Sequence, residues 1–183
     1  MKTLQAALAA SLLVPAVALA TPIDFTATLG GAQEVPAVNS PATGTATGRL
    51  TGSAGAWIFE YTVRYEGLLG GIGAPFAHVH VGPRGVNGPI VHDLDGANQA
   101  PIAGSRAGTI TGNWRYDDAS RPLTDALAND LIAGRLYFNV HTTQFPGGEI
   151  RGQVVPVPEP ASVALFGLAL AGASVLRRRR SAA

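Results

Sequence analysis

The sequence predicts an all-β domain: an antiparallel Greek-key β-sandwich or barrel with one short helix. Glycine and proline are frequent, with 23 and 13 in the chain, and they lie between short apolar runs as turns lie between strands. Residues 56–66 alternate between apolar and polar side chains with a period of two, which is typical of a half-buried strand. Eight short strand candidates, separated by turn signals at regular spacing, favour an antiparallel architecture.

The expected strands follow one another along the central part of the chain. They cover residues 23–29, 43–50, 56–66, 76–81, 90–94, 108–114, 135–142 and 149–155. In the third strand, the side chains expected on one face are Trp57, Phe59, Tyr61, Val63 and Tyr65. In the seventh strand, we expect Leu136, Phe138 and Val140 to point into the core.

One helix is expected between the sixth and seventh strands. Leu123, Leu127 and Leu131 recur every four residues, as on one face of a helix. Pro122 is expected in its first turn, where a missing N–H costs nothing, and Gly134 stands where a helix commonly ends.

The first 20 residues have the features of a secretory signal peptide. Lys2 supplies a positive charge, an apolar run extends from residue 4 to residue 19, and Ala18 and Ala20 are small residues two positions apart before Thr21. We therefore expect export through the Sec machinery and cleavage after Ala20. A membrane anchor or a buried helix is the alternative.

Residues 157–183 form a second targeting segment. Pro158, Glu159 and Pro160 precede an apolar stretch at 163–176, and a basic cluster follows it: Arg177, Arg178, Arg179 and Arg180. A helix of about 14 to 16 apolar residues is roughly 21–24 Å long, less than the ~30 Å hydrocarbon core of a bilayer. The arginines would place the C-terminal end of this helix on the cytoplasmic side of the membrane. The prolines cannot continue a helix, so the globular part ends before them.

The order of these features over residues 157–180 resembles the PEP-CTERM sorting signal of Gram-negative bacteria. The resemblance implies recognition and cleavage by an exosortase, with transient inner-membrane association of the C-terminus. The protein would then be located in the cell envelope or outside the cell. A lasting C-terminal membrane anchor is the alternative.

The segment between the two signals, residues 21–156, is expected to be one domain. Lys2 and the four tail arginines account for five of the 13 basic residues, whereas all 12 acidic residues precede residue 161. Over residues 21–160, eight basic against 12 acidic residues leave a formal charge near −4, and no basic patch indicates nucleic-acid binding. The chain has no cysteine, so the domain is held by packing without disulfides or thiolate ligands.

Four blocks in this domain resemble the CHRD (chordin) domain family over roughly residues 23–154. They are FTATLGGAQEVP at 25–36, AHVHVG at 77–82, GVNGPIV at 85–91 and LYFNVHTTQFPGGEIRGQV at 136–154. Ala37 departs from the family pattern, which usually has a second proline there. The resemblance implies a secreted β-sandwich module without a settled activity. Glu34 is a feature of the family, and our default expectation for it is an interstrand pair with an arginine.

The histidines are the candidate metal ligands. His78 and His80 would project from the same face of a strand, with Cα atoms about 6.5–7 Å apart, and could converge on one ion. His141 would join them if their strands are neighbours, and His92 could be a fourth ligand. Imidazole ligands without thiols suit copper or zinc. The order of these histidines also resembles the copper side of copper/zinc superoxide dismutases, although that family's second-metal cluster and cysteine pair are missing. The alternative is that the histidines are solvated or hydrogen-bond a loop.

The sequence contains none of the common hydrolase or nucleotide-binding signatures. Residues 92–96 with Asn98 offer clustered oxygens but lack the spacing of an EF-hand, which favours a turn. Our first hypothesis is therefore a non-catalytic module of the cell surface or exopolysaccharide matrix that binds a protein, a polysaccharide or itself. The second is a copper- or zinc-binding protein with a possible oxidoreductase activity.

Overall fold

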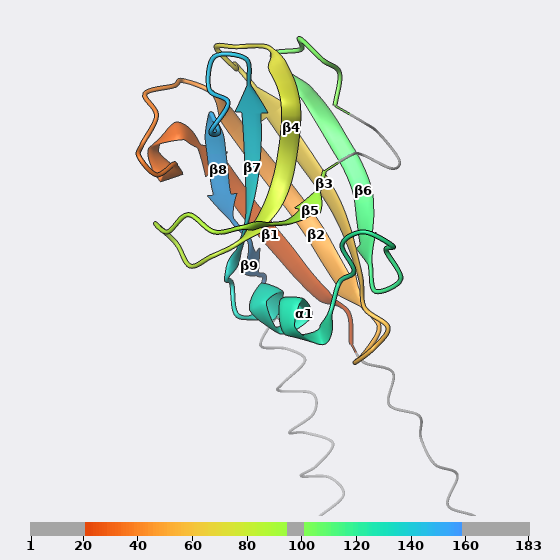
Figure 1. The fold of residues 1–183 in the computed structure, drawn as a ribbon. Coiled ribbons are helices and arrows are strands. Elements are labelled where there is room, and N and C mark those ends of the chain that lie inside the picture. Colours follow the sequence, from red (N-terminus) through yellow and green to blue (C-terminus); the bar gives the residue numbers. More distant parts are fainter. Residues whose placement is uncertain (1–20, 95–100, 159–183) are drawn as a thin grey trace, which may run out of the picture.

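A computed structural model describes residues 21–94 and 101–158 of the chain (Figure 1). The expected signal peptide, residues 95–100 with Asp95 and Asn98 of the expected turn, and the tail from residue 159 lie outside the described residues. The roles expected of Ala18, Ala20, Glu159, Pro160 and the four arginines at 177–180 therefore stay predictions. The described segments contain no helix that is long and apolar enough to cross a membrane.

The described part of the chain is almost entirely β-structure, as the sequence predicts. The strands are β1 (Ile23–Gly30), β2 (Thr43–Thr51), β3 (Ile58–Glu66), β4 (Ile72–Val81), β5 (Ile90–Asp93), β6 (Gly108–Arg115), β7 (Leu136–Thr142), β8 (Ile150–Gln153) and β9 (Val155–Pro156). A 3₁₀ turn, η1 (Gly31–Gln33), follows β1, and one helix, α1 (Asp125–Ile132), precedes β7.

The strands form an antiparallel sheet that folds over on itself into a nearly closed barrel. Their order is β5-β4-β7-β8-β1-β2-β3-β6, and β9 pairs with β1. A single residue pair, Gly30 with Arg151, joins β1 to β8. In Figure 1, β4, β7 and β8 lie in front of β1, β2 and β3. Strand β3 pairs with β6, and strand β4 pairs with β7. The connections between consecutive strands therefore cross between the two halves, as in a Greek key.

Aromatic side chains fill the space between the two halves. Phe59 of β3 stacks against Phe138 of β7 with ring centres 6.5 Å apart, and Phe25 of β1 meets Phe59 edge-on at 5.7 Å. The end strands β5 and β6 also meet, because the ring of His92 stacks on Trp114 at 5.1 Å. This packing confirms the inward face that the alternation in residues 57–65 predicts, although Trp57 at its edge is only half-buried.

Three elements differ from their sequence predictions. The eighth strand, expected over residues 149–155, is interrupted at Val154 and forms β8 and β9. The helix begins after Thr124, whose hydroxyl accepts a hydrogen bond from the Leu127 N–H, so Pro122 precedes the helix and does not lie in its first turn. The helix ends as expected, before Gly134 in the left-handed region at φ +68°. Strand β4 begins at Ile72, four residues earlier than expected, and its pairing with β7 shifts between Ile72 and Ala77.

A buried carboxylate ties three loops together at one end of the barrel. Glu149 is fully buried, and its two oxygens accept hydrogen bonds from the Ser40 and Thr142 hydroxyls at 2.7 and 2.8 Å. The same oxygens accept from the backbone N–H groups of Leu69 and Gly70 at 2.7 and 3.4 Å. The chain has no cysteine and therefore no disulfide. The hydrogen bonds of this carboxylate instead link segments that are far apart in sequence.

We predict that Glu149→Gln lowers the free energy of unfolding by about 3 kcal/mol, because an amide NH₂ would face donors that need an acceptor. Urea denaturation of the exported protein measures the change. Glu60→Gln, on the exposed side of β3, is the matched control and should change stability by no more than about 0.5 kcal/mol. Equal effects of the two substitutions would contradict the prediction.

Candidate metal site

The candidate site lies on the outer face of the β4-β7-β8 half of the sheet. His78 and His80 come from β4 and His141 comes from β7, which is the neighbour of β4. The register pairs His78 with Asn139, while the alternating apolar residues Val79 and Phe138 point into the core. We call His78, His80 and His141 the three-histidine group. Each is at most 9% exposed, and one ring nitrogen from each lies within 4.8 Å of the others.

A loop carbonyl holds one nitrogen of two of these rings. His80 Nδ1 lies 2.9 Å from the Gly88 carbonyl oxygen, and His141 Nδ1 lies 3.0 Å from the Pro146 carbonyl oxygen. Because a carbonyl only accepts, both Nδ1 atoms carry the hydrogen, and both Nε2 atoms are left with a lone pair. This is the arrangement in which histidine binds a metal through Nε2.

The third ring is held by a carboxylate. His78 Nε2 lies 3.5 Å from an oxygen of Asp93, and the other Asp93 oxygen lies 3.2 Å from the Arg121 guanidinium. The register explains the contact, because His78 and Asp93 are cross-strand partners of β4 and β5. A carboxylate behind a histidine is a common second-shell partner in metal sites. The sequence placed Asp93 in the oxygen-rich segment at 92–96, which was expected to form a turn, and gave no sign that it would contact His78.

Two of the nitrogens that remain lie close together, and the third has no hydrogen-bond partner. His78 Nδ1 lies 3.0 Å from His141 Nε2, and His80 Nε2 is buried without a hydrogen-bond partner. If His78 Nδ1 donates to His141, its own Nε2 presents a lone pair to the Asp93 carboxylate, which is unfavourable. A cation between the rings would instead accept all three lone pairs and leave His78 Nε2–H to donate to Asp93. The donor set therefore fits a metal ion.

Burial keeps these rings in the neutral form that binds metals. Desolvation is the largest cause that lowers the pKa of all three, and with the smaller contributions the pKa of His141 is about 4. The neighbouring rings lower the pKa of His78 and His141 further, since protonating one ring beside another adds charge repulsion. Protons therefore compete little with a metal ion at neutral pH.

His92, the expected fourth ligand, is not brought to this group. It is the cross-strand partner of Val79, so it faces the core side of the sheet, whereas His78 and His80 face outwards. There its ring stacks on Trp114, and its Nε2 lies 3.5 Å from the Tyr61 hydroxyl. Because side chains alternate along a strand, the register of β5 placed His92 on the opposite face.

Two residues that sequence reasoning did not select fix the walls of the site. The Tyr137 ring stacks on His80 with centres 4.9 Å apart, and the Arg151 guanidinium lies 3.5 Å from the centre of the same ring. Arg151 also donates to the side chain of Asn87 and to the Val86 carbonyl, while Tyr137 accepts from the Gly88 N–H. The loop at 82–89 is thereby held over the histidines.

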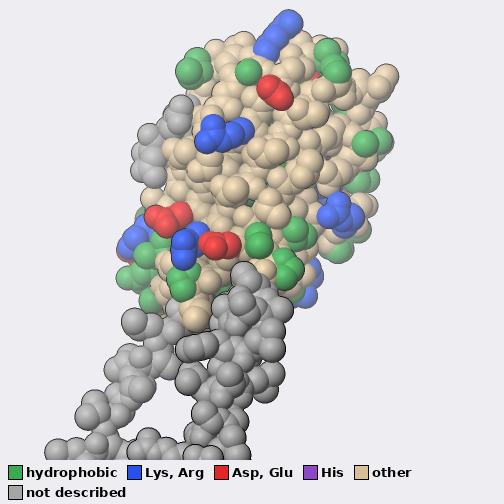
Figure 2. Space-filling model, turned by 180° about the vertical axis from the view of Figure 1, so that it is seen from behind, with side chains coloured by type: hydrophobic (Ala, Val, Ile, Leu, Met, Phe, Trp, Pro, Cys, Tyr) green, Lys and Arg blue, Asp and Glu red, His purple; other side chains and the backbone are tan. Residues whose placement is uncertain are grey.

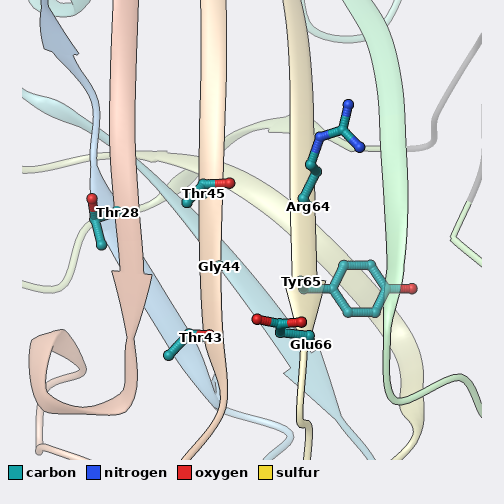
Figure 3. A pocket seen from close by; sticks show the side chains of 7 residues that line it. All are labelled: Thr28, Thr43, Gly44, Thr45, Arg64, Tyr65 and Glu66. Atoms are coloured by element: carbon teal, nitrogen blue, oxygen red, sulfur yellow. The ribbon is translucent and has the colours of Figure 1, made fainter.

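The outer face of the other half of the barrel has a different character. Four threonines, Thr26, Thr47, Thr62 and Thr111, form one row of cross-strand partners over β1, β2, β3 and β6. Figure 2 shows this face as mainly polar and uncharged, with scattered arginines and acidic residues. A shallow pocket next to the row is lined by threonines with Arg64 and Glu66 (Figure 3). None of its lining residues is a metal-binding histidine.

Comparisons with known proteins agree with this architecture. Residues 25–154 match the CHRD domain family, and residues 156–180 match the PEP-CTERM protein-sorting motif. No curated protein and no solved structure matches the chain. The CHRD match extends from β1 to the end of β8 and includes the three-histidine group, Tyr137 and Arg151. The chain therefore belongs to the CHRD domain family and carries a PEP-CTERM sorting motif behind that domain.

Proposed function

We propose that this exosortase-sorted extracellular protein binds a copper or zinc ion through His78, His80 and His141. One observation carries the proposal. Each ring has one nitrogen next to a second-shell group, and one ring nitrogen from each of the three lies within 4.8 Å of the others. An orphaned and buried nitrogen such as His80 Nε2 costs roughly 1–3 kcal/mol unless it finds a partner.

The donor chemistry supports these two metals. Neutral imidazoles are good ligands for copper and zinc, and the chain has no thiolate that would compete for the ion. The three rings are almost fully buried, and the loop at 82–89 is pinned above them. An ion in this position would be shielded from bulk solvent. Such shielding favours a tightly held ion that stabilises a binding module, and it disfavours rapid turnover of a substrate.

We predict that the full chain, exported and purified from the periplasm without a metal-binding tag, contains close to one copper or zinc ion per molecule. The double variant His78→Ala/His141→Ala should lose the ion, whereas His92→Asn should keep it, because His92 lies on the other side of the sheet. Metal analysis by mass spectrometry provides the measurement.

A second measurement covers the case in which the metal is lost during purification. Copper or zinc added to the metal-free protein should raise the melting temperature, since an ion that binds only the folded state stabilises it. A folded protein that purifies without metal and shows no shift with either ion would refute the proposal.

A second candidate function is a structural or adhesive role in the cell surface or exopolysaccharide matrix. The observation that favours it is the hydroxyl-rich face of β1, β2, β3 and β6, where the row from Thr26 to Thr111 offers evenly spaced donors and acceptors to a polysaccharide or a protein. This role is compatible with a bound ion on the opposite face of the barrel.

The sorting motif gives a test of processing that leaves the domain intact. The Val157 N–H donates to the Asp24 carbonyl, so the folded domain extends to within one residue of Pro158. We predict that deletion of residues 159–183 abolishes exosortase processing while the domain still folds.

An immunoblot of membrane and medium fractions follows the size of the protein. Deletion of residues 181–183 alone keeps the motif and the arginines and should leave processing unchanged. Normal processing of the longer deletion would show that the tail is not the recognised signal.

A further inference from the structure

A buried glutamate lies beside the same sheet face and takes no part in holding the histidine rings. Glu34 directly follows η1 and is only 7% exposed, and its Oε1 atom is buried without a hydrogen-bond partner. The side-chain oxygen of Asn139, the cross-strand partner of His78, is buried and unpartnered in the same way. Both atoms are acceptors, and each needs a donor.

Both oxygens lie beside Gly148. A Cβ atom added to Gly148 would lie 2.6 Å from Glu34 Oε1 and would collide with the Asn139 side-chain oxygen. Gly148 has φ +124°, which only glycine adopts readily. The loop thus brings a carboxyl and an amide oxygen close together, and one hydrogen shared between them would satisfy both.

The charged groups around Glu34 do not supply that hydrogen. The Arg151 guanidinium on β8 is committed to Asn87, Val86 and the Tyr137 ring. Arg84, on the loop at 82–89, donates to the Gln33 side chain.

Of the other elements around Glu34, the segment before β8 brings the Glu149 carboxylate, which accepts from the Ser40 hydroxyl and whose backbone carbonyl lies next to Gly31. The rings of His78, His80 and His141 face the same side from β4 and β7 and are neutral, and residues 143–148 carry no charged side chain. Burial raises the pKa of Glu34 to about 7, and the positive charge of Arg151 only partly opposes this.

The segment that carries Glu34 is connected to the loop over the histidines. The Asn87 side chain donates to the Val35 carbonyl at 2.7 Å, and the Arg84–Gln33 hydrogen bond adds a second link at 2.9 Å. The same loop holds His80 through the Gly88 carbonyl. A displacement of residues 31–38 would therefore loosen the cover of the three-histidine group.

We propose that Glu34 is a proton-dependent latch over the three-histidine group: its neutral carboxyl donates to Asn139 and keeps residues 31–38 closed, and its ionisation opens them and admits an ion. The admission of an ion rests on the proposed function. The latch itself requires only that Glu34 and Asn139 share a hydrogen bond in the closed state.

The direction of the pH dependence follows from linkage. A carboxyl with a raised pKa in the closed state binds its proton more tightly there, so closure is strongest below the ordinary value of 4.5 and weakens as the pH rises to about 7. The opening equilibrium should therefore rise about tenfold per pH unit between pH 5 and 7 and level off above that.

Hydrogen exchange of the full chain in metal-free form, followed by mass spectrometry at pH 5–8.5 and corrected for intrinsic rates, tests the latch. In the wild type, the corrected exchange rates of residues 31–38 and 82–89 should rise about tenfold per pH unit between pH 5 and 7. Glu34→Gln should show low, pH-independent exchange there, because its amide donates at every pH. Glu60→Gln, an exposed substitution on β3, should behave as wild type.

A second measurement needs no variant. A nuclear magnetic resonance titration of the side-chain carboxyl carbon of Glu34 should give a midpoint near 7 in the wild type. A midpoint near the ordinary value of 4.5, or exchange of residues 31–38 that does not depend on pH, would overturn the latch.

Stopped-flow mixing with zinc or copper then separates the two proposals. If both hold, ion uptake by the wild type should accelerate from pH 5 to 7 more than uptake by Glu34→Gln. If the exchange result holds and neither ion binds, the latch stands and the proposed function fails. If both ions bind at equal rates in the two proteins, residues 31–38 do not control access.

Discussion

The burial of β7 on both of its faces is the constraint on which the site depends. One face, with Leu136, Phe138 and Val140, packs into the core as the sequence predicts. The other face carries Tyr137, Asn139 and His141 and is also buried, because loops lie over it. A polar strand face under loops must satisfy its donors and acceptors within the protein, since water no longer does so.

The protein meets most of this requirement with backbone carbonyls from the covering loops. The carbonyls of Gly88 and Pro146 orient two histidines, and that of Val86 accepts from Arg151. Three side-chain atoms in the described residues are left over: His80 Nε2, Glu34 Oε1 and Asn139 Oδ1. They lie on one face of the sheet, and a metal ion and a carboxyl proton between them would complete the network. Such concentrated unsatisfied polarity is typical of functional sites.

The two outer faces of the barrel therefore suit different roles. The face over β4, β7 and β8 is closed and dependent on its loops, whereas the face over β1, β2, β3 and β6 is open and rich in threonine. Because the chain has no cysteine, the loop contacts of Arg151 and Glu149 are important for its stability. Both are buried charged side chains with several hydrogen-bond partners, and removing such partners is costly.

The sequence by itself determined the β-class, the approximate bounds of the strands, the family and the pairing of His78 with His80. Alternation along a strand is a local property, so residues two apart must share a face. Tertiary structure alone decided that His141 joins them and His92 does not. That outcome depends on which strands are neighbours and on a register in which a shift of one residue reverses every side chain. It also decided the positions of Asp93, Arg151 and Glu34 around the rings, because these contacts are made between segments far apart in the chain, about which local patterns carry no information.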